Sequence, residues 1–195
     1  METAHLFALA LALAWLSGLR VHLTVFAIGL AGLLGSVELP PGLQVCSSPW
    51  VLGVSGVLTV VEFSADKIPG VDSVWDLLST VLRVPVGAWL AGATLAAPDE
   101  SLSLAGLLAG GGAALLSHGL KSGGRALINT SPEPLSNWTA SLAEDSLAVG
   151  ALLWLVHYPW LTLLALVVLS LLGFLLLLWL LRGLGRGVGA LLGRG

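Results

Sequence analysis

The chain has very little charge. Only 10% of its 195 residues are Asp, Glu, Lys or Arg, whereas 56% are hydrophobic and the mean hydropathy is +0.97. A water-soluble domain of this length needs more charge to keep its surface hydrated. The segment 160–181 contains no ionisable side chain and is long enough to cross the ~30 Å hydrocarbon core of a bilayer as one helix. The composition therefore predicts an integral membrane protein.

Other scarcities exclude whole classes of function. The single cysteine, Cys46, has no partner for an internal disulfide and no neighbour at metal-ligand spacing. The eight Lys and Arg residues are scattered and the formal net charge is −3, so nucleic acid is not an expected partner. A serine–histidine pair of Ser55 and His118 rests on too short a motif to indicate catalysis. We therefore expect no enzyme activity, no cofactor and no metal.

Six apolar blocks alternate with separators rich in Pro, Gly, Ser and Asp. The blocks cover about 4–35, 48–63, 73–97, 101–130, 137–157 and 159–181. This pattern predicts an all-α, polytopic membrane helical bundle with about six membrane elements. We expect a single transmembrane domain over residues 1–182, followed by a basic, glycine-rich cytoplasmic tail at 183–195.

Two of the blocks, 4–35 and 101–130, are too long for one straight span and too short for two. Each is interrupted near its middle by a glycine close to a cation, at Gly18–Leu19–Arg20 and at His118–Gly119–Leu120–Lys121. Backbone that leaves helical geometry at membrane depth must face protein or a water-filled cavity. The sequence therefore predicts two broken or re-entrant helices.

The loop charges predict the topology. If all six blocks cross, Lys67 and Arg182 lie on one side of the membrane, and the separators without Lys or Arg lie on the other. Because positive loops stay in the cytoplasm, both termini are expected there. This arrangement gives the halves 1–97 and 101–182 opposite orientations, which is the inverted repeat of many transporters. Four full spans with two re-entrant hairpins form the alternative.

Ionisable side chains within apolar blocks are costly unless paired or hydrated, so they are candidates for function. On a continuous helix His118, Lys121, Arg125 and Asn129 share one stripe, and the neighbouring glycines let a ligand approach. With Arg20 they form a predicted anion-binding site. Arg125 would hold a carboxylate or phosphate by two hydrogen bonds, and Lys121 would act as a point charge. The alternative is an internal salt-bridge network.

The acidic residues are expected to neutralise that site or to carry a coupling proton. Glu62 and Asp66 are four residues apart and, if the helix continues to Asp66, share a helix face, so that one of them would hold a proton. The alternative is that Glu62 pairs structurally with an arginine. Asp76 and Arg83 also share a side of one helix, either as a buried pair or as interface residues. The other candidates for ion pairing or proton coupling are Glu144 and Asp145.

Three segments carry a family resemblance. They are VEFSADKIPGVDSVWDLL at 61–78, HGLKSGGRALINTSPEPLSNW at 118–138 and SLAEDSLAVG at 141–150. They resemble the signature segments of a bacterial integral-membrane family, domain of unknown function 4126, and the match covers most of residues 15–150. The resemblance implies a small multi-pass protein of the bacterial inner membrane. It implies no particular activity, substrate or site residue.

The sequence therefore predicts a membrane transporter or flippase-like protein for an anionic substrate, with proton coupling. The substrate is either a phosphate-bearing lipid or a small organic anion, and membrane lipids are further expected partners. The glycine spacings Gly106–Gly110 and Gly185–Gly189–Gly193 are compatible with a homodimer. The alternative function is a non-transporting membrane scaffold or assembly factor whose intramembrane charges are structural.

Overall fold

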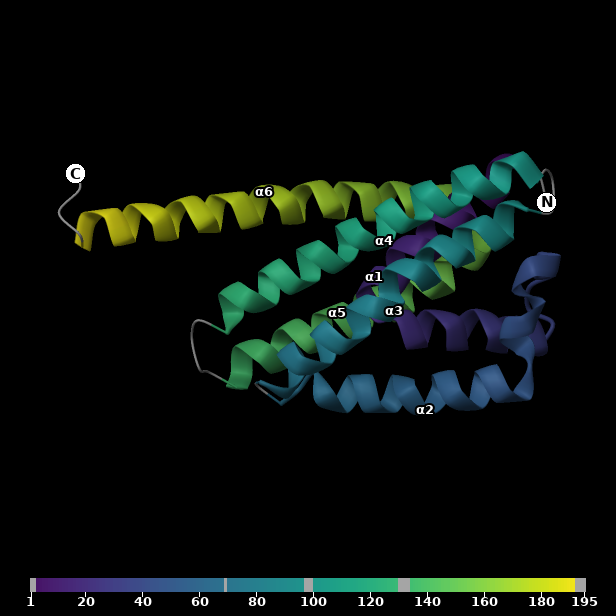
Figure 1. Ribbon diagram of the computed structural model, residues 1–195, viewed down its shortest axis with the longest axis horizontal. Helices are drawn as coiled ribbons and strands as arrows, with labels where there is room; N and C mark the ends of the chain where they lie inside the picture. The colour runs from purple at the N-terminus through teal and green to yellow at the C-terminus, as the bar shows by residue number, and fades with distance from the viewer. Residues whose placement is uncertain (1–2, 69, 97–99, 130–133, 192–195) are drawn as a thin grey trace.

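The computed structural model describes residues 3–68, 70–96, 100–129 and 134–191, with the backbone alone described at 73, 134 and 184–191. Within these ranges all regular structure is helical, as the sequence predicts (Figure 1). The elements are α1 (Thr3–Leu33), the 3-10 helix η1 (Pro41–Ser47), α2 (Pro49–Ala65), α3 (Val71–Leu95), α4 (Glu100–Ile128), α5 (Pro134–His157) and α6 (Pro159–Leu191).

The helices are long and apolar enough for a membrane. By length and composition α1, α3, α4, α5 and α6 each qualify as a span, and η1 with α2, bent by 66°, adds a sixth. Large apolar side chains such as Leu153, Leu172 and Trp179 are exposed on the outer surface of the bundle. In water this surface would be unfavourable, whereas in a bilayer it contacts lipid. The protein is a helical membrane bundle.

Helix α1 consists of two arms that fold back on each other at Arg20. The backbone of Arg20 leaves the helical region, with φ −143° and ψ 79°. In a straight helix Leu9 and Ile28 would lie about 28 Å apart, but both line one cavity of the folded protein. The second arm returns to the end of the bundle at which the first begins (Figure 1). The predicted break at Arg20 is therefore confirmed, as the tip of a re-entrant hairpin.

The break expected at His118–Lys121 does not form. Helix α4 continues from Glu100 to Ile128 through both residues. A helical glycine costs only about 1 kcal/mol relative to alanine, so Gly119 is tolerated when tertiary contacts favour the helix. The continuous helix places Lys121 and Arg125 on one buried face. A second bend occurs instead between η1 and α2.

The hairpin changes the topology. Helix α1 begins at the right-hand end of the bundle in Figure 1, and α6 ends at the left-hand end. We call these the base end, where both arms of α1 meet residues 34–40, and the turn end, where residues 66–70 join α2 to α3. The expectation that both termini share the cytoplasmic side does not fit this fold, because a hairpin leaves an odd number of crossings. The two halves are also built differently, so the inverted repeat gains no support.

The hairpin is held by close helix contacts and by hydroxyl groups. Gly18 lies against Ala114 and Ser117 of α4, where a Cβ atom would collide with the backbone of α4. Ser117 Oγ donates to the carbonyl oxygen of Trp15 at 2.6 Å, and Thr24 Oγ1 donates to that of Arg20 at 2.8 Å. These bonds satisfy backbone groups around the bend, which a membrane interior would otherwise leave unpaired.

The small-residue spacing Gly106–Gly110 is used within the chain. Both glycines pack against α3, next to Ala91 and Gly87. Gly193 lies outside the described residues, and at Gly185 and Gly189 the structure describes only the helical backbone of α6, which continues to Leu191. The homodimer remains a prediction.

We expect Gly18→Ala to destabilise the protein by about 1–3 kcal/mol, because the new methyl group meets the backbone of α4 and cannot be relieved by a rotamer change. Thermal unfolding in detergent measures the effect. Gly112→Ala on α4 is the matched control, since nothing lies within 4 Å of a Cβ there. An equal melting temperature for the two variants would show that the hairpin does not pack as described.

The loop charges predict which end faces the cytoplasm. Lys67 belongs to the turn between α2 and α3, and Arg182 belongs to the last part of α6, the helix that ends on the same side, while residues 34–48 of the base end contain no Lys or Arg. In a Cys46→Ala background, Arg182→Cys should react with a membrane-impermeant maleimide only after the cells are permeabilised. Glu38→Cys should react in intact spheroplasts. Labelling of both cysteines from the same side would contradict the re-entrant hairpin.

Candidate functional site: a buried charge network

Charged side chains from α1 to α5 meet inside the bundle, between the tip of the hairpin and the turn end. The four most buried cations have side chains that are 4% exposed or less. Every one of them lies within 4.0 Å of at least one carboxylate. We call this group the charge network, and its members are Arg20, Glu62, Asp66, Lys67, Asp72, Asp76, Arg83, Lys121, Arg125, Glu144 and Asp145.

Asp66 is the point at which the cations converge. Its Oδ2 atom accepts a hydrogen bond from Arg20 and lies 3.1 Å from Lys121 Nζ and 3.9 Å from Arg125 Nη2. The side chain is fully buried, and its other oxygen, Oδ1, has no hydrogen-bond partner. Asp66 is the C-cap residue of α2, so the end of that helix positions the carboxylate. Cations from α1 and α4 thus form an anion position that the protein's own carboxylate fills.

Arg83 connects a second part of the network. Its Nη2 atom lies 2.8 Å from Glu62 Oε1, and its Nη1 atom lies 2.8 Å from Asp76 Oδ1. Glu62 also contacts His22 Nδ1 at 3.1 Å, which ties the second arm of α1 to α2 and α3. His118 belongs to this part as well, because its Nδ1 atom lies 3.1 Å from Arg83 Nη1. Arg83 therefore braces α2 against α3.

Arg125 forms a bidentate contact with a carboxylate of the protein itself. Its Nε and Nη2 atoms each donate to a different oxygen of Glu144 at 3.1 Å, and Nη1 donates to Asn137 Oδ1 at 2.7 Å. The amides of Asn129 and Asn137 donate to Asp72 Oδ2 at 3.3 and 3.4 Å. The two hydrogen bonds that the sequence predicts from Arg125 to a ligand go to Glu144 here, as in the alternative of an internal salt-bridge network, and its role in anion binding stays a prediction.

Lys67 and Asp145 form the accessible edge of the network. Both side chains are 17% exposed, and Lys67 Nζ lies 3.8 Å from Asp145 Oδ2 and 2.9 Å from the centroid of the Phe63 ring. Arg20 Nη2 reaches the other oxygen of Asp145 at 2.8 Å. Partial burial lowers the pKa of Lys67 below its usual value, Arg20 lowers it further, and the attraction of Asp145 opposes both. Lys67 therefore loses its proton more readily than an ordinary lysine.

The network contains one more acid than base. Six carboxylates face five cations, while His22 and His118 add charge only when protonated. A net charge in a low-dielectric interior is costly, so the network favours the uptake of one proton or cation. The count agrees with the prediction that an acid here carries a proton.

All the residues predicted for the site lie in this network or form a hydrogen bond with it. Asn129 takes part through Asp72, and His118 through Arg83. Sequence reasoning did not place Asp72 in the site, although its Oδ2 joins the network while its Oδ1 accepts from the Gly70 amide at 2.9 Å. It also missed His22, which lies beyond the bend at Arg20. No spacing rule could have brought His22 to Glu62, because the hairpin places it there.

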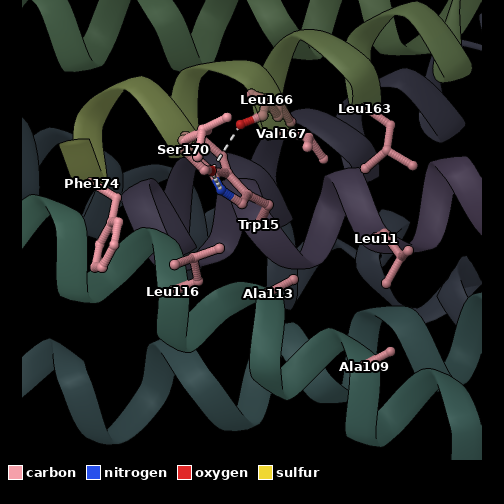
Figure 2. Close-up of a pocket in the computed structure, with 11 residues that line it drawn as sticks. Leu11, Trp15, Ala109, Ala113, Leu116, Leu163, Leu166, Val167, Ser170 and Phe174 are labelled. Atoms are coloured by element: carbon pink, nitrogen blue, oxygen red, sulfur yellow. Dashed lines mark hydrogen bonds between the residues drawn. The ribbon is translucent and has the colours of Figure 1, made fainter.

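A separate cavity of about 580 Å³ lies between α1, α4 and α6, away from the network (Figure 2). Leucine, valine, alanine and phenylalanine side chains form most of its wall. Its polar feature is the hydrogen bond from Trp15 Nε1 to Ser170 Oγ at 2.8 Å. Within the described part of the chain, no three or more His, Cys, Asp or Glu side chains are grouped to hold a metal ion. The charge network is therefore the candidate site.

The family defined as "Domain of unknown function (DUF4126)" matches residues 7–179. The chain belongs to this family. The match reaches every α-helix and includes the whole charge network, and it extends the resemblance noted in residues 15–150. No curated protein and no solved structure matches the chain.

We expect Arg83→Leu to reduce the free energy of unfolding by about 3–5 kcal/mol, because it leaves the buried Glu62 and Asp76 carboxylates without their shared cation. Chemical or thermal unfolding in detergent measures the loss. Arg182→Leu, at an exposed arginine of α6, is the control and should change stability by less than about 0.5 kcal/mol. A small effect of Arg83→Leu would mean that the brace is not formed.

Proposed function

We propose that the protein is a proton-coupled membrane transporter for an anionic substrate, and that the acidic group of the substrate replaces the Asp66 carboxylate. The observation that carries this proposal is the convergence of Arg20, Lys121 and Arg125 on one oxygen of Asp66. Cations from two separate helices surround a single acidic group, as they would surround a carboxylate or phosphate ligand.

Charge balance links the anion to a proton. Protonation of Asp66 cancels its attraction for the three cations and leaves their positive charge for a ligand. A monovalent anion that then binds returns the network to its original net charge. Uptake of one proton with one anion is thus electroneutral, whereas an anion alone would add a second uncompensated negative charge to the buried network. Proton coupling follows from the excess carboxylate.

The residues at the site lie where the backbone can move. Arg20 forms the tip of the hairpin, and Asp66 ends α2 directly before the turn to α3. Ends of elements absorb backbone changes more readily than helix interiors. Interrupted helices that carry charged groups to mid-membrane are also the usual construction of transporter sites. A shift of Asp66 away from Arg20 would open the anion position.

A scaffold or assembly factor is the second candidate, without catalysis or transport. The observation that favours it is the complete pairing of the buried cations, each of which already has a carboxylate partner. In that case the network only fixes the helices relative to one another. The two candidates differ in what happens when the carboxylate of Asp66 is neutralised.

We expect Asp66→Asn to bind small anions more tightly than the wild type, because three cations then lack their common counter-ion. Acetate and inorganic phosphate should raise the melting temperature of Asp66→Asn by several degrees and that of the wild type by much less. Glu38→Gln, at an exposed acid of the base end outside the network, is the control. If Asp66→Asn simply loses about 3–5 kcal/mol of stability that no anion restores, the structural candidate is favoured.

Transport itself is tested in proteoliposomes. An inward proton gradient should drive uptake of the anionic substrate by the wild type, and Asp66→Asn should abolish the dependence on the gradient. Phosphate-bearing lipids and small carboxylates form the panel of substrates. Absence of flux and of lipid flipping for the whole panel would overturn the transporter proposal.

A further inference from the structure

A cavity of about 230 Å³ leads sideways from the charge network to the outside of the bundle, between α2 and α5. Its floor contains three charged residues of the network, Arg20, Glu62 and Asp145. Its rim contains Val60 and Phe63 of α2 and Val149 of α5. The cavity therefore connects buried charge with an apolar surface.

The rim faces the hydrocarbon of the membrane. Val60, Phe63 and Val149 are 66%, 43% and 45% exposed, on helices that the bilayer surrounds. Helices α2 and α5 are not among the pairs that pack together in the described residues. They are joined near the turn end, where Trp138 Nε1 donates to the carbonyl oxygen of Lys67 at 3.0 Å. The gap between them is thus open toward lipid.

The floor of the cavity has a free donor for an acidic group. Arg20 Nε is buried and has no hydrogen-bond partner. The two carboxylates beside it have other cations: Arg83 contacts Glu62, and Lys67 contacts Asp145. A phosphate oxygen at Arg20 would therefore leave neither carboxylate without a counter-ion.

Among the described residues the network is largely closed at the turn end. The side chains of Asp66, Asp72 and Asn137 there are 1% exposed or less, and Lys67, at 17%, is the partly exposed edge. Glu144 and Asp145, on the α5 side, are 16% and 17% exposed. A ligand can thus reach the network from the α5 side, where the cavity opens, as well as beside Lys67.

We call this cavity the α2–α5 cleft. We propose that it admits the substrate from the bilayer and that the substrate is a lipid with a phosphate-bearing headgroup. This inference rests on the proposed anion transport and adds the class of substrate and its route. The cavity is smaller than the 300–1,000 Å³ typical of sites that enclose a whole ligand. It accommodates a headgroup at Arg20, while the acyl chains remain in the bilayer along Val60, Phe63 and Val149. Lys67 guides the phosphate at the membrane interface.

The test uses substitutions that narrow the entrance of the cleft and leave its charged residues unchanged. Val149→Trp places a large ring at the rim, and Val81→Trp, on an exposed position of α3 that does not line the cavity, is the matched control. Native mass spectrometry of the purified protein with added phosphatidylglycerol measures lipid binding. We expect Val149→Trp to weaken binding at least about tenfold and Val81→Trp to leave it unchanged. Val60→Trp gives the same test from the opposite wall if Val149→Trp does not fold.

The outcomes separate this inference from the function on which it rests. Equal phosphatidylglycerol binding by wild type and both cleft variants overturns the lateral route. Phosphatidylglycerol binding that Arg20→Gln leaves unchanged, or equally tight binding of diacylglycerol, which has no phosphate, overturns the role of Arg20 at the phosphate. In another outcome, Val149→Trp retains no lipid and still takes up soluble glycerol phosphate when a proton gradient is applied. That result would identify the substrate as a free anion. It would overturn the lipid inference and leave the proposed anion transport intact. If no anion changes the melting temperature of Asp66→Asn, the proposed anion transport and the lipid inference are both overturned.

Discussion

The contact between Arg20 and Asp66 determines much of the rest of the structure. A charge inside a membrane protein costs several kcal/mol unless a partner offsets its desolvation. Arg20 lies at the tip of the α1 hairpin, and Asp66 lies at the end of α2, which starts at the base end, where the hairpin also begins. Their pairing requires the hairpin to stop at the depth where α2 ends. Lys121 and Arg125 reach the same carboxylate because α4 passes beside the hairpin tip and the end of α2.

Such a hairpin needs neighbours that can come close. Gly18 allows α4 to contact the backbone of the first arm, and Gly87 lies against Ala14 and Ser17 on the side of α3. Ser17 Oγ donates to the carbonyl oxygen of Arg83 at 3.2 Å, directly beside the residue that braces Glu62 and Asp76. The small residues of α1 thus do more than fill space. They hold the tip in register with the charges on α3 and α4.

The sequence predicts much of this fold, but not its topology. The alternation of apolar blocks with turn-rich separators locates all six long helices, because burial in lipid imposes a length and composition that few other structures require. Hydropathy cannot separate a bent span from a hairpin, since both are equally apolar. The 31 residues of α1 fit either. Glycine is a similarly ambiguous signal: next to Arg20 it accompanies a bend, whereas Gly119 stays within a regular helix.

The candidate site, like the fold, could be predicted only in part from the sequence. The stripe of His118, Lys121 and Arg125 follows from helical periodicity, so spacing alone brings these side chains together. Their partners come from other helices and depend on how the hairpin packs, and His22 could not be placed without it. The burial of Asp72 could not be predicted for a related reason, because this residue of the first turn of α3 is covered by Asn129 and Asn137 of two other segments.

The unequal charge of the network argues against a purely structural role. A network that only pins helices together is most stable when acids and bases balance, because any excess charge remains in a low-dielectric interior. Here one carboxylate exceeds the cations, Asp66 Oδ1 and Arg20 Nε remain without hydrogen-bond partners, and the cavity at Arg20 opens toward lipid. The atoms Asp66 Oδ1 and Arg20 Nε lie along one line that leads to the α2–α5 cleft, whereas Arg83 Nε and Trp75 Nε1 are buried without hydrogen-bond partners elsewhere. Unpaired groups in a membrane interior are expensive to keep, and the two on this line are the ones that the proposed lipid headgroup would reach.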